Sequence, residues 1–291
     1  MQRLSLLISS LRQTLRIMAR NRVGFAGFIL TMFVVLLAML GPFFIHLDMT
    51  AHTELIYQGP SAAHWLGTDN QGRDIMMQII SGGRSVVYVG ALAAFLTVAV
   101  GVTLGSLAAV VGGWVDSVIN GVAEIVITIP KFPLLLVLAG FIQLDSPTGL
   151  ALILASIGWG SLMRAIRAQV LSLKERDYVQ AARALGLPTS HLLFKEIMPN
   201  MMSYILVQFV MNMTDAVYSQ VGLVFLGIVP LESNNWGVML QYAWRFGAIF
   251  SANSRWFLFV PIFMIVLLQF SLVTMSRSLD EVFNPRLRVG E

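Results

Sequence analysis

The feature that most constrains this chain is a set of long apolar runs without Asp, Glu, Lys or Arg. Residues 23–47, 85–115 and 256–276 are such runs. Each reaches or exceeds the roughly 20 apolar residues that an α-helix needs to cross a bilayer. The chain is 57% hydrophobic and 12% charged, whereas soluble domains carry about 25% charged residues. The sequence therefore predicts a polytopic, all-α membrane protein.

The first run superficially resembles a secretory signal, because five arginines precede it within residues 1–22. A signal peptide has an apolar core of only about 7–15 residues, followed by a small-residue cleavage site. This run is 25 residues long and no such site follows it. We therefore predict a retained first span, preceded by a cytoplasmic amphipathic segment at residues 1–22.

Charge-poor stretches predict about six transmembrane helices in one domain that covers residues 23–291. The predicted spans are 23–47, 84–111, 118–142, 148–171, 201–224 and 256–277. They leave outer loops at 46–83 and 225–255, a cytoplasmic loop at 172–200 and a cytoplasmic tail at 278–291.

The distribution of Lys and Arg orients these spans. With six spans both termini lie on one side, which then holds fourteen of the 19 Lys and Arg residues, against four on the other side and Lys131 inside a span. Positively charged loops face the cytoplasm. We therefore predict a multi-pass protein of the cytoplasmic (inner) membrane with both termini in the cytoplasm. This placement also accounts for the pI near 9.7 without a nucleic-acid partner.

Small residues recur every four positions at the end of the second span, at Gly101, Gly105, Ala109 and Gly113. This spacing places them on one helix face, where another helix can approach closely. We favour packing within this chain over a contact with another subunit.

The cytoplasmic loop contains the sequence QAARALGLPTSHLLFKEIMP at residues 180–199. Its alanines favour a first helix, with Tyr178, Ala182 and Leu185 on one face. Gly186 suits a left-handed C-terminal cap that ends this helix.

A second short helix is predicted after this corner. Ser190 suits its N-terminal cap, and Pro199 breaks the chain before the fifth span. The pair of short helices either binds another protein or lies on the lipid headgroups.

The loop resembles the EAA loop of ABC-importer permeases, in which Glu-Ala-Ala is followed by Gly and then Pro. The matching residues are Gln180, Ala181, Ala182, Gly186 and Pro199, with Gln180 in place of the usual Glu. Further stretches are similar to the dipeptide, oligopeptide and nickel permeases in particular. These are HWLGTD at 64–69, GRD at 72–74, FLG at 225–227, WGVML at 236–240, LD at 279–280 and NPRLR at 284–288.

This resemblance implies a type I ABC-importer permease fold and a C-type subunit. It implies four kinds of partner: a second homologous permease subunit, two ATP-binding subunits, an extracytoplasmic solute-binding protein and membrane lipid. ATP and Mg are then expected on the ATPase subunits, to which the loop couples. The implied coupling residues are Tyr178, Gln180, Ala181, Ala182, Gly186, Leu192, Leu193 and Pro199.

Apart from the arginines counted above with one side of the membrane, three ionisable residues, Glu124, Lys131 and Asp215, fall within the predicted spans. Each costs roughly 2.5–3.5 kcal/mol at the membrane centre, so they should face a cavity or each other. They either line the transport pathway or form structural ion pairs. Pro130 and Pro133 predict that the third span is a bent helix that lines the pathway.

A polar motif ends the first outer loop. It comprises Gly67, Thr68, Asp69, Gly72, Arg73 and Asp74. These residue types favour a tight turn, in which Asp69 or Asp74 pairs with Arg73. We favour a structural role, folding the loop back onto the spans, over a role in receiving a binding protein.

The sequence carries no enzyme signature. None of its three lysines follows a Gly, which excludes a GxxxxGK[ST] phosphate loop, and GxSxG and HExxH are absent. The chain has no Cys, and its four histidines form no local metal-ligand pair. We predict no metal site and no cofactor bound by this chain.

The predicted function is that of an importer permease that carries half of the pathway and works by alternating access. Di- or oligopeptides are the expected cargo, with nickel complexes and oligosaccharides as alternatives. Two rivals remain: an ion-coupled secondary carrier with Glu124, Lys131 and Asp215 as its relay, and a membrane scaffold or receptor that transports nothing.

Overall fold

The structure is a computed structural model that describes residues 18–45, 47–142, 144, 146–231 and 234–283. This part of the chain consists of helices and loops without a strand, which confirms the all-α prediction. The predicted amphipathic segment up to residue 17, His46 and the motif at 284–288 lie outside the described residues.

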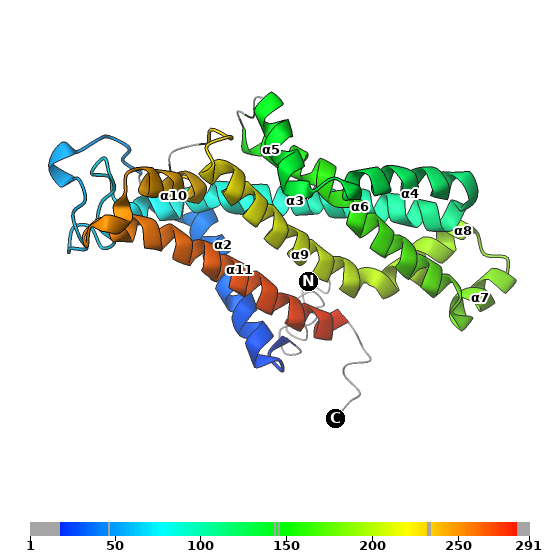
Figure 1. The fold of residues 1–291 in the computed structure, drawn as a ribbon. Helices are drawn as coiled ribbons and strands as arrows, with labels where there is room; N and C mark the ends of the chain where they lie inside the picture. The colour runs from blue at the N-terminus through cyan, green and yellow to red at the C-terminus, as the bar shows by residue number, and fades with distance from the viewer. Residues whose placement is uncertain (1–17, 46, 143, 145, 232–233, 284–291) are drawn as a thin grey trace.

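Ten α-helices in the described residues carry the fold (Figure 1). Their bounds are α2 Arg22–Phe44, α3 Ile75–Val111, α4 Gly113–Thr128, α5 Lys131–Phe141, α6 Pro147–Lys174, α7 Asp177–Ala184, α8 Thr189–His191, α9 Met198–Phe225, α10 Trp236–Arg245 and α11 Arg255–Phe283.

The long helix α3 is the centre of the arrangement. It packs against α6, α9 and α2, while α11 packs against α2 and α9. Figure 1 shows α7 and α8 at one end of the molecule and α10 at the other. The two polar loop regions of the sequence are thereby held at opposite ends of an apolar body.

Each of the six predicted spans falls on a long helix or a helix pair. Among the described residues, α2, α3, α6 and α11 are long and apolar enough to cross a membrane, and the bent pair α4–α5 passes the same test together. The helix of the fifth predicted span, α9, has 28 residues but is less apolar than these. Its polar residues explain the difference, because several of them line a cavity inside the bundle.

The second predicted span begins too late in the sequence. α3 starts at Ile75 and not at residue 84, because Asp74 caps it by accepting a hydrogen bond from the Met77 amide at 3.0 Å. The resulting helix has 37 residues and a length of about 55 Å. It therefore extends well beyond the roughly 30 Å hydrocarbon core of a bilayer.

The small residues of the second span pack within this chain. A Cβ on Gly101 would meet Leu162 of α6 at 2.9 Å, and one on Gly105 would meet the Met163 carbonyl oxygen at 2.5 Å. Gly113 does not belong to this strip, contrary to the prediction. It starts α4 with φ +56°, and nothing lies within 4 Å of a Cβ there. The strip ends with α3, because the chain reverses at Gly112 and Gly113.

Replacing Gly105 by Leu should strongly destabilise the fold. The backbone of α6 occupies the space that the side chain needs, so α3 and α6 must separate, and such overpacking costs about 1–3 kcal/mol or more. Thermal unfolding of the purified protein in detergent measures the effect. The matched control is Gly121→Leu in α4, where nothing lies within 4 Å of a Cβ. Equal unfolding temperatures for the two variants would contradict the role of Gly105.

Candidate functional site

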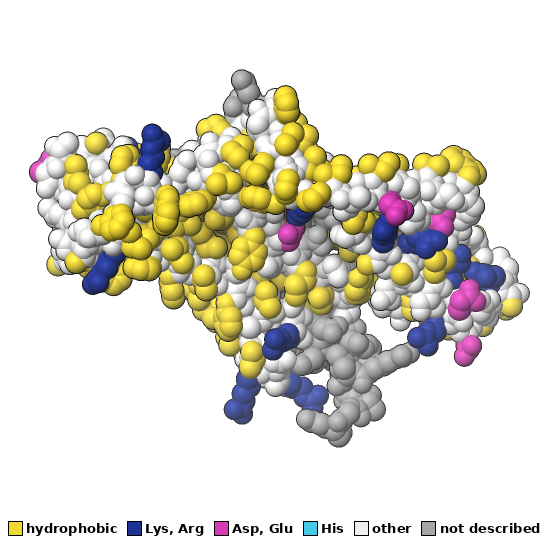
Figure 2. All heavy atoms as spheres, viewed as in Figure 1, with side chains coloured by type: hydrophobic (Ala, Val, Ile, Leu, Met, Phe, Trp, Pro, Cys, Tyr) yellow, Lys and Arg dark blue, Asp and Glu magenta, His cyan; other side chains and the backbone are white. Residues whose placement is uncertain are grey.

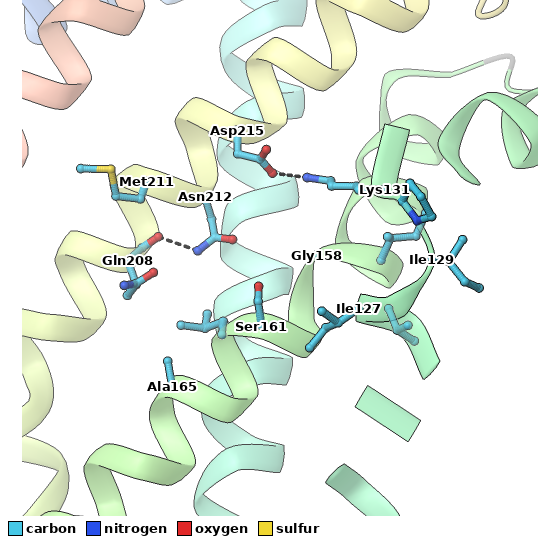
Figure 3. A pocket seen from close by; sticks show the side chains of 14 residues that line it. Ile127, Ile129, Lys131, Gly158, Ser161, Ala165, Gln208, Met211, Asn212 and Asp215 are labelled. Atoms are coloured by element: carbon cyan, nitrogen blue, oxygen red, sulfur yellow. Dashed lines mark hydrogen bonds and ion pairs between the residues drawn. The ribbon is translucent and has the colours of Figure 1, made fainter. Parts of the chain in front are cut away.

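A cavity of about 530 Å³ opens between α4, α5, α6 and α9. Its walls are mixed, with mostly apolar side chains from α4 and α6 and mostly polar side chains from α9, joined by Ser161 and Lys131 (Figure 3). The lining residues are Val126, Ile127, Ile129, Pro130, Lys131, Ile157, Gly158, Ser161, Leu162, Ala165, Gln208, Met211, Asn212 and Asp215.

A sharp break in the chain forms one wall of this cavity. α4 ends at Thr128 and α5 begins at Lys131, with an angle of 87° between them. Pro130 caps α5 and Pro133 lies in its first turn, where a missing amide N–H is tolerated. The bend predicted from the two prolines is therefore present, but it separates two helices, and the first begins at Gly113 and not at residue 118.

Lys131 and Asp215 form an ion pair across the cavity. The Lys131 Nζ donates to Asp215 Oδ2, which joins α5 to α9 (Figure 3). The two side chains are 32% and 56% exposed, respectively. The structure thus brings together two of the three ionisable residues found in the predicted spans, and places both on the wall of one cavity.

The third residue, Glu124, does not join them. Its carboxylate lies 3.4 Å from Arg164 of α6 and does not line the cavity. A further pair nearby was not predicted: Arg167 donates through Nε and Nη2 to the two carboxylate oxygens of Asp116. The two arginines therefore tie α6 to α4 at two levels.

After the C-terminal end of α6, the chain turns into the short helix α7. Gly186 has φ +74°, and its amide donates to the Arg183 carbonyl while the Leu187 amide donates to the Ala182 carbonyl. This geometry confirms the predicted left-handed cap. Because Gly adopts such a φ with less strain than any other residue, the direction of the corner depends on this position.

A helix follows the corner, as predicted, but it is not a separate short helix, and the predicted break after it is wrong. Ser190 is not its cap, because the helix begins at Thr189 with Pro188 at the N-cap position. α8 then runs directly into a π-helical segment, Leu192–Ile197, and on into α9. Pro199 lies in the first turn of α9 and does not end a helix. The π-helical turn explains why Pro199 does not break the helix. In this wider turn the hydrogen bonds run from residue i to residue i−5, as from the Met198 amide to the Leu193 carbonyl, next to Pro199, which has no amide N–H to donate.

The predicted apolar face of α7 is also wrong. Val179 is fully buried and Ala182 is 8% exposed, whereas Tyr178 is 40% and Leu185 is 81% exposed. The side chains that pack inward are three residues apart, and Val179 lies in one cluster with Ile166, Val170 and Ile197. α7 therefore seats on α6 and on the start of α9 through Val179.

The remaining residues for which the resemblance implies a coupling role differ in exposure. Leu192 is buried and Leu193 is half-buried, while Ala181 and Pro199 are exposed. Phe194, which the sequence reasoning missed, is 65% exposed. With Tyr178 and Leu185 it forms a set of large apolar side chains that the fold itself does not cover, and we call these three residues the loop surface.

Gln180 fastens α7 to the end of α6. Its Nε2 donates to the Lys174 carbonyl at 3.0 Å, which is one of the carbonyls left free at a helix C-terminus. Lys174 in turn donates from Nζ to the Ala109 carbonyl of α3 at 2.9 Å. An amide thus serves at the position where the resemblance led us to expect a carboxylate.

The outer-loop motif folds into a tight turn, with Gly67 and Gly72 at φ +77° and +76°. Asp69 accepts hydrogen bonds from the Gln71 and Arg73 amides and from Gln78 Nε2. Thr68 receives the Gln58 amide on its Oγ1 at 2.8 Å. The Asp69 carboxylate therefore organises the turn through backbone amides.

The predicted ion pair with Arg73 is wrong. Asp74 pairs with His64 Nδ1 at 2.9 Å and caps α3. The Nε of Arg73 is buried without a hydrogen-bond partner among the described residues. Both carboxylates prefer the closer donors that the turn and the helix N-terminus supply.

The second outer segment docks on α3 through α10. Trp236 is 1% exposed and its Nε1 donates to the Ile79 carbonyl at 2.8 Å. Asn234 donates to Ser81 at 3.1 Å, and a Cβ on Gly82 would collide with the Asn234 carbonyl oxygen. The N-terminal end of α3 and the C-terminal end of α9 are thereby held together through α10.

Comparison with known proteins shows which proteins this chain resembles. The profile of the family "Binding-protein-dependent transport system inner membrane component" matches residues 101–289. The chain is 34% identical over 274 residues to the oligopeptide transport system permease protein OppC of Bacillus subtilis, covering 92% of this chain and 87% of that protein. It is 30% identical over 277 residues to the dipeptide transport system permease protein DppC of the same organism, covering 94% and 85%.

A further relative is the dipeptide transport system permease protein DppC of Haemophilus influenzae, at 31% identity over 277 residues and 92% coverage of each chain. The family match includes α4, α5, α6 and α9, the four helices that line the cavity, and it also includes α7. The cavity and the loop surface therefore both lie in the part of the chain that is similar to these proteins.

Proposed function

The chain belongs to the family of binding-protein-dependent transport system inner membrane components, and we propose that it is the permease subunit of an ATP-driven importer of di- or oligopeptides. The observation that carries the proposal is the partly polar cavity between α4, α5, α6 and α9. A helical body with an apolar surface and a polar-lined cavity is suited to moving a polar solute through lipid. Figure 2 shows this surface, with hydrophobic side chains over much of the visible face.

The chain supplies half of the pathway in this proposal. A second homologous permease completes the cavity from the other side, and an extracytoplasmic solute-binding protein delivers the peptide to the outer end. The positive-inside distribution of Lys and Arg supports cytoplasmic termini. α7 and α8 then face the cytoplasm, and the surrounding lipid covers the apolar helices.

Two ATP-binding subunits supply the energy. The loop surface of Tyr178, Leu185 and Phe194 is apolar and exposed, and it is the part of the cytoplasmic end that suits a groove on an ATPase. In Figure 2 charged side chains gather at the end that carries α7 and α8. Such a polar rim around apolar anchors is typical of protein–protein interfaces.

Movement of α7 reaches the cavity through packed contacts. Val179 of α7, Ile166 of α6 and Ile197 beside α9 are buried in the same cluster, and α6 and α9 both carry cavity residues. ATP binding closes the ATPases and displaces α7, and the helices then open the cavity outward to accept the peptide. Hydrolysis returns the inward-open state.

One observation favours an ion-coupled carrier as a second candidate: a Lys–Asp pair lies inside the cavity. The three-residue relay that this candidate needs does not form, because Glu124 pairs with Arg164 outside the cavity. The two candidates differ in their energy source, so they can be separated directly.

Purification from the native membrane in mild detergent tests the proposal. We expect a second permease and P-loop ATPases to be recovered with the tagged chain and identified by mass spectrometry. Proteoliposomes of the recovered complex with the binding protein should take up a tripeptide only with ATP. Recovery of the chain alone, together with uptake that follows an ion gradient without ATP, would establish the carrier instead.

A further inference from the structure

One carboxylate oxygen of Asp215 accepts no hydrogen bond from the described residues and is available to a ligand in the cavity. Oδ2 accepts from Lys131 Nζ, whereas Oδ1 receives no hydrogen bond from any residue that the structure describes. The side chain is 56% exposed, against 32% for Lys131. A ligand with a positively charged donor can therefore reach Oδ1 without displacing Lys131.

The surroundings of Asp215 suit the main chain of a peptide. On α9, Gln208, Met211 and Asn212 precede Asp215 by seven, four and three residues, so all four lie on one helix face. All four line the cavity, and Figure 3 shows Asp215 directed toward Lys131. Asn212 Nδ2 already donates to the Gln208 main-chain carbonyl at 2.7 Å, but its Oδ1 and the Gln208 carboxamide can bind peptide groups. Met211 adapts to side chains of different shapes.

The wall of the cavity that faces α9 leaves room for a bound peptide. Ser161 and Ala165 of α6 are small, whereas Ile127 and Ile157 supply apolar surface. Such walls accept varied side chains without selecting among them. Only a group that every peptide carries can then be recognised in all cargoes, and the α-ammonium is such a group.

We infer that Asp215 is a subsite for the α-ammonium group of a peptide in transit, with its Oδ1 as the acceptor and Lys131 as the counter-charge that limits its affinity. This inference rests on the proposed function. Lys131 partly neutralises the carboxylate, so an arriving ammonium is held weakly. A transport pathway requires such weak binding, because the solute must leave as readily as it enters.

A single-cysteine reporter can measure occupancy of the cavity. Because the sequence contains no Cys, Ser161→Cys supplies the only thiol of this chain. The complete complex carrying this reporter is treated with a charged methanethiosulfonate, and mass spectrometry of this chain gives the modification rate. The measurement is made without the binding protein, which could itself reject blocked peptides. The probes are trialanine, N-acetyl-trialanine and trialanine amide.

Trialanine and trialanine amide should both slow the modification, and N-acetyl-trialanine should not. In the reporter background, Asp215→Asn should raise the apparent Kd of trialanine about five- to tenfold, since a charge-assisted hydrogen bond is lost. Asp215→Glu should restore most of the affinity. Lys131→Met keeps the carboxylate and removes its counter-charge, so trialanine should bind at least as tightly as before.

A structural ion pair predicts a different pattern, because loss of either partner should then weaken trialanine equally. The matched control is Glu124→Gln, which removes a paired carboxylate in α4 outside the cavity and should leave protection unchanged. Equal protection by trialanine and N-acetyl-trialanine, or none by either, would overturn the subsite. Protection by the acetylated peptide but not by the amide would assign recognition to the carboxyl end instead. The proposed function fails separately, if the complex shows no ATP-dependent peptide uptake.

Discussion

The Leu185→Asp substitution should release the ATPase subunits from the complex and abolish ATP-driven uptake. Leu185 follows α7 and is 81% exposed, so the permease itself has little need of this side chain for folding. In the proposed complex the same side chain is buried in an ATPase groove. An unpaired carboxylate there loses the apolar contact and its own hydration together, a loss of about 2–4 kcal/mol for an interface hot spot.

Co-purification through a tag on the permease measures this release. Leu185→Met, which conserves volume and apolarity, should retain the ATPases. Phe250→Asp provides a second control, because Phe250 is 91% exposed but lies in the outer segment. It should retain them as well. A Leu185→Asp complex that keeps its ATPases would show that the loop surface is not the contact.

The helices could be predicted because their cause is local. A run such as 256–276 has no charge, and its place in lipid follows from composition alone. The Gly186 corner was equally accessible, since a left-handed cap requires a particular residue type at a particular position. The start of α3 was missed because the predicted span was bounded at the charged residue Arg84, which the helix in fact includes.

The ion pairs could not be predicted because their partners are distant in the sequence. Lys131 and Asp215 are 84 residues apart, and Asp116 and Arg167 are 51 residues apart. Each residue alone indicated only that it must face a cavity or a partner. Which partner it finds depends on the 87° break between α4 and α5, whose direction the two prolines do not specify.

The face of α7 shows a third kind of limit. An eight-residue helix offers too few turns for periodicity to decide between alternative faces. Tyr178, Ala182 and Leu185 fit one apolar stripe, but the burial of Val179 settles the matter in favour of another. The decisive contact is with Ile166 of α6, and no signal within the loop indicates it.

Gly186→Val should separate ATP hydrolysis from transport while leaving the complex assembled. At φ +74° a β-branched residue is strongly disfavoured, at a cost of roughly 1–2 kcal/mol even for an ordinary side chain. No neighbour adds to this cost, because nothing lies within 4 Å of a Cβ there. The corner should therefore relax to another backbone conformation, and the loop surface should bind the ATPases without directing their movement into α6 and α9.

The expected result is a fall of about tenfold in the number of peptides transported per ATP hydrolysed, in keeping with the conformational penalty. Membrane insertion and ATPase co-purification should persist, in contrast to Leu185→Asp. Gly186→Asn should act as the matched control, because Asn tolerates the left-handed region, and Gly186→Ala should fall between Asn and Val. Gly140→Val in α5 makes the same chemical change where space is also open and should not disturb the ratio. Transport by Gly186→Val at the normal rate per ATP would show that the direction of this corner does not carry the coupling.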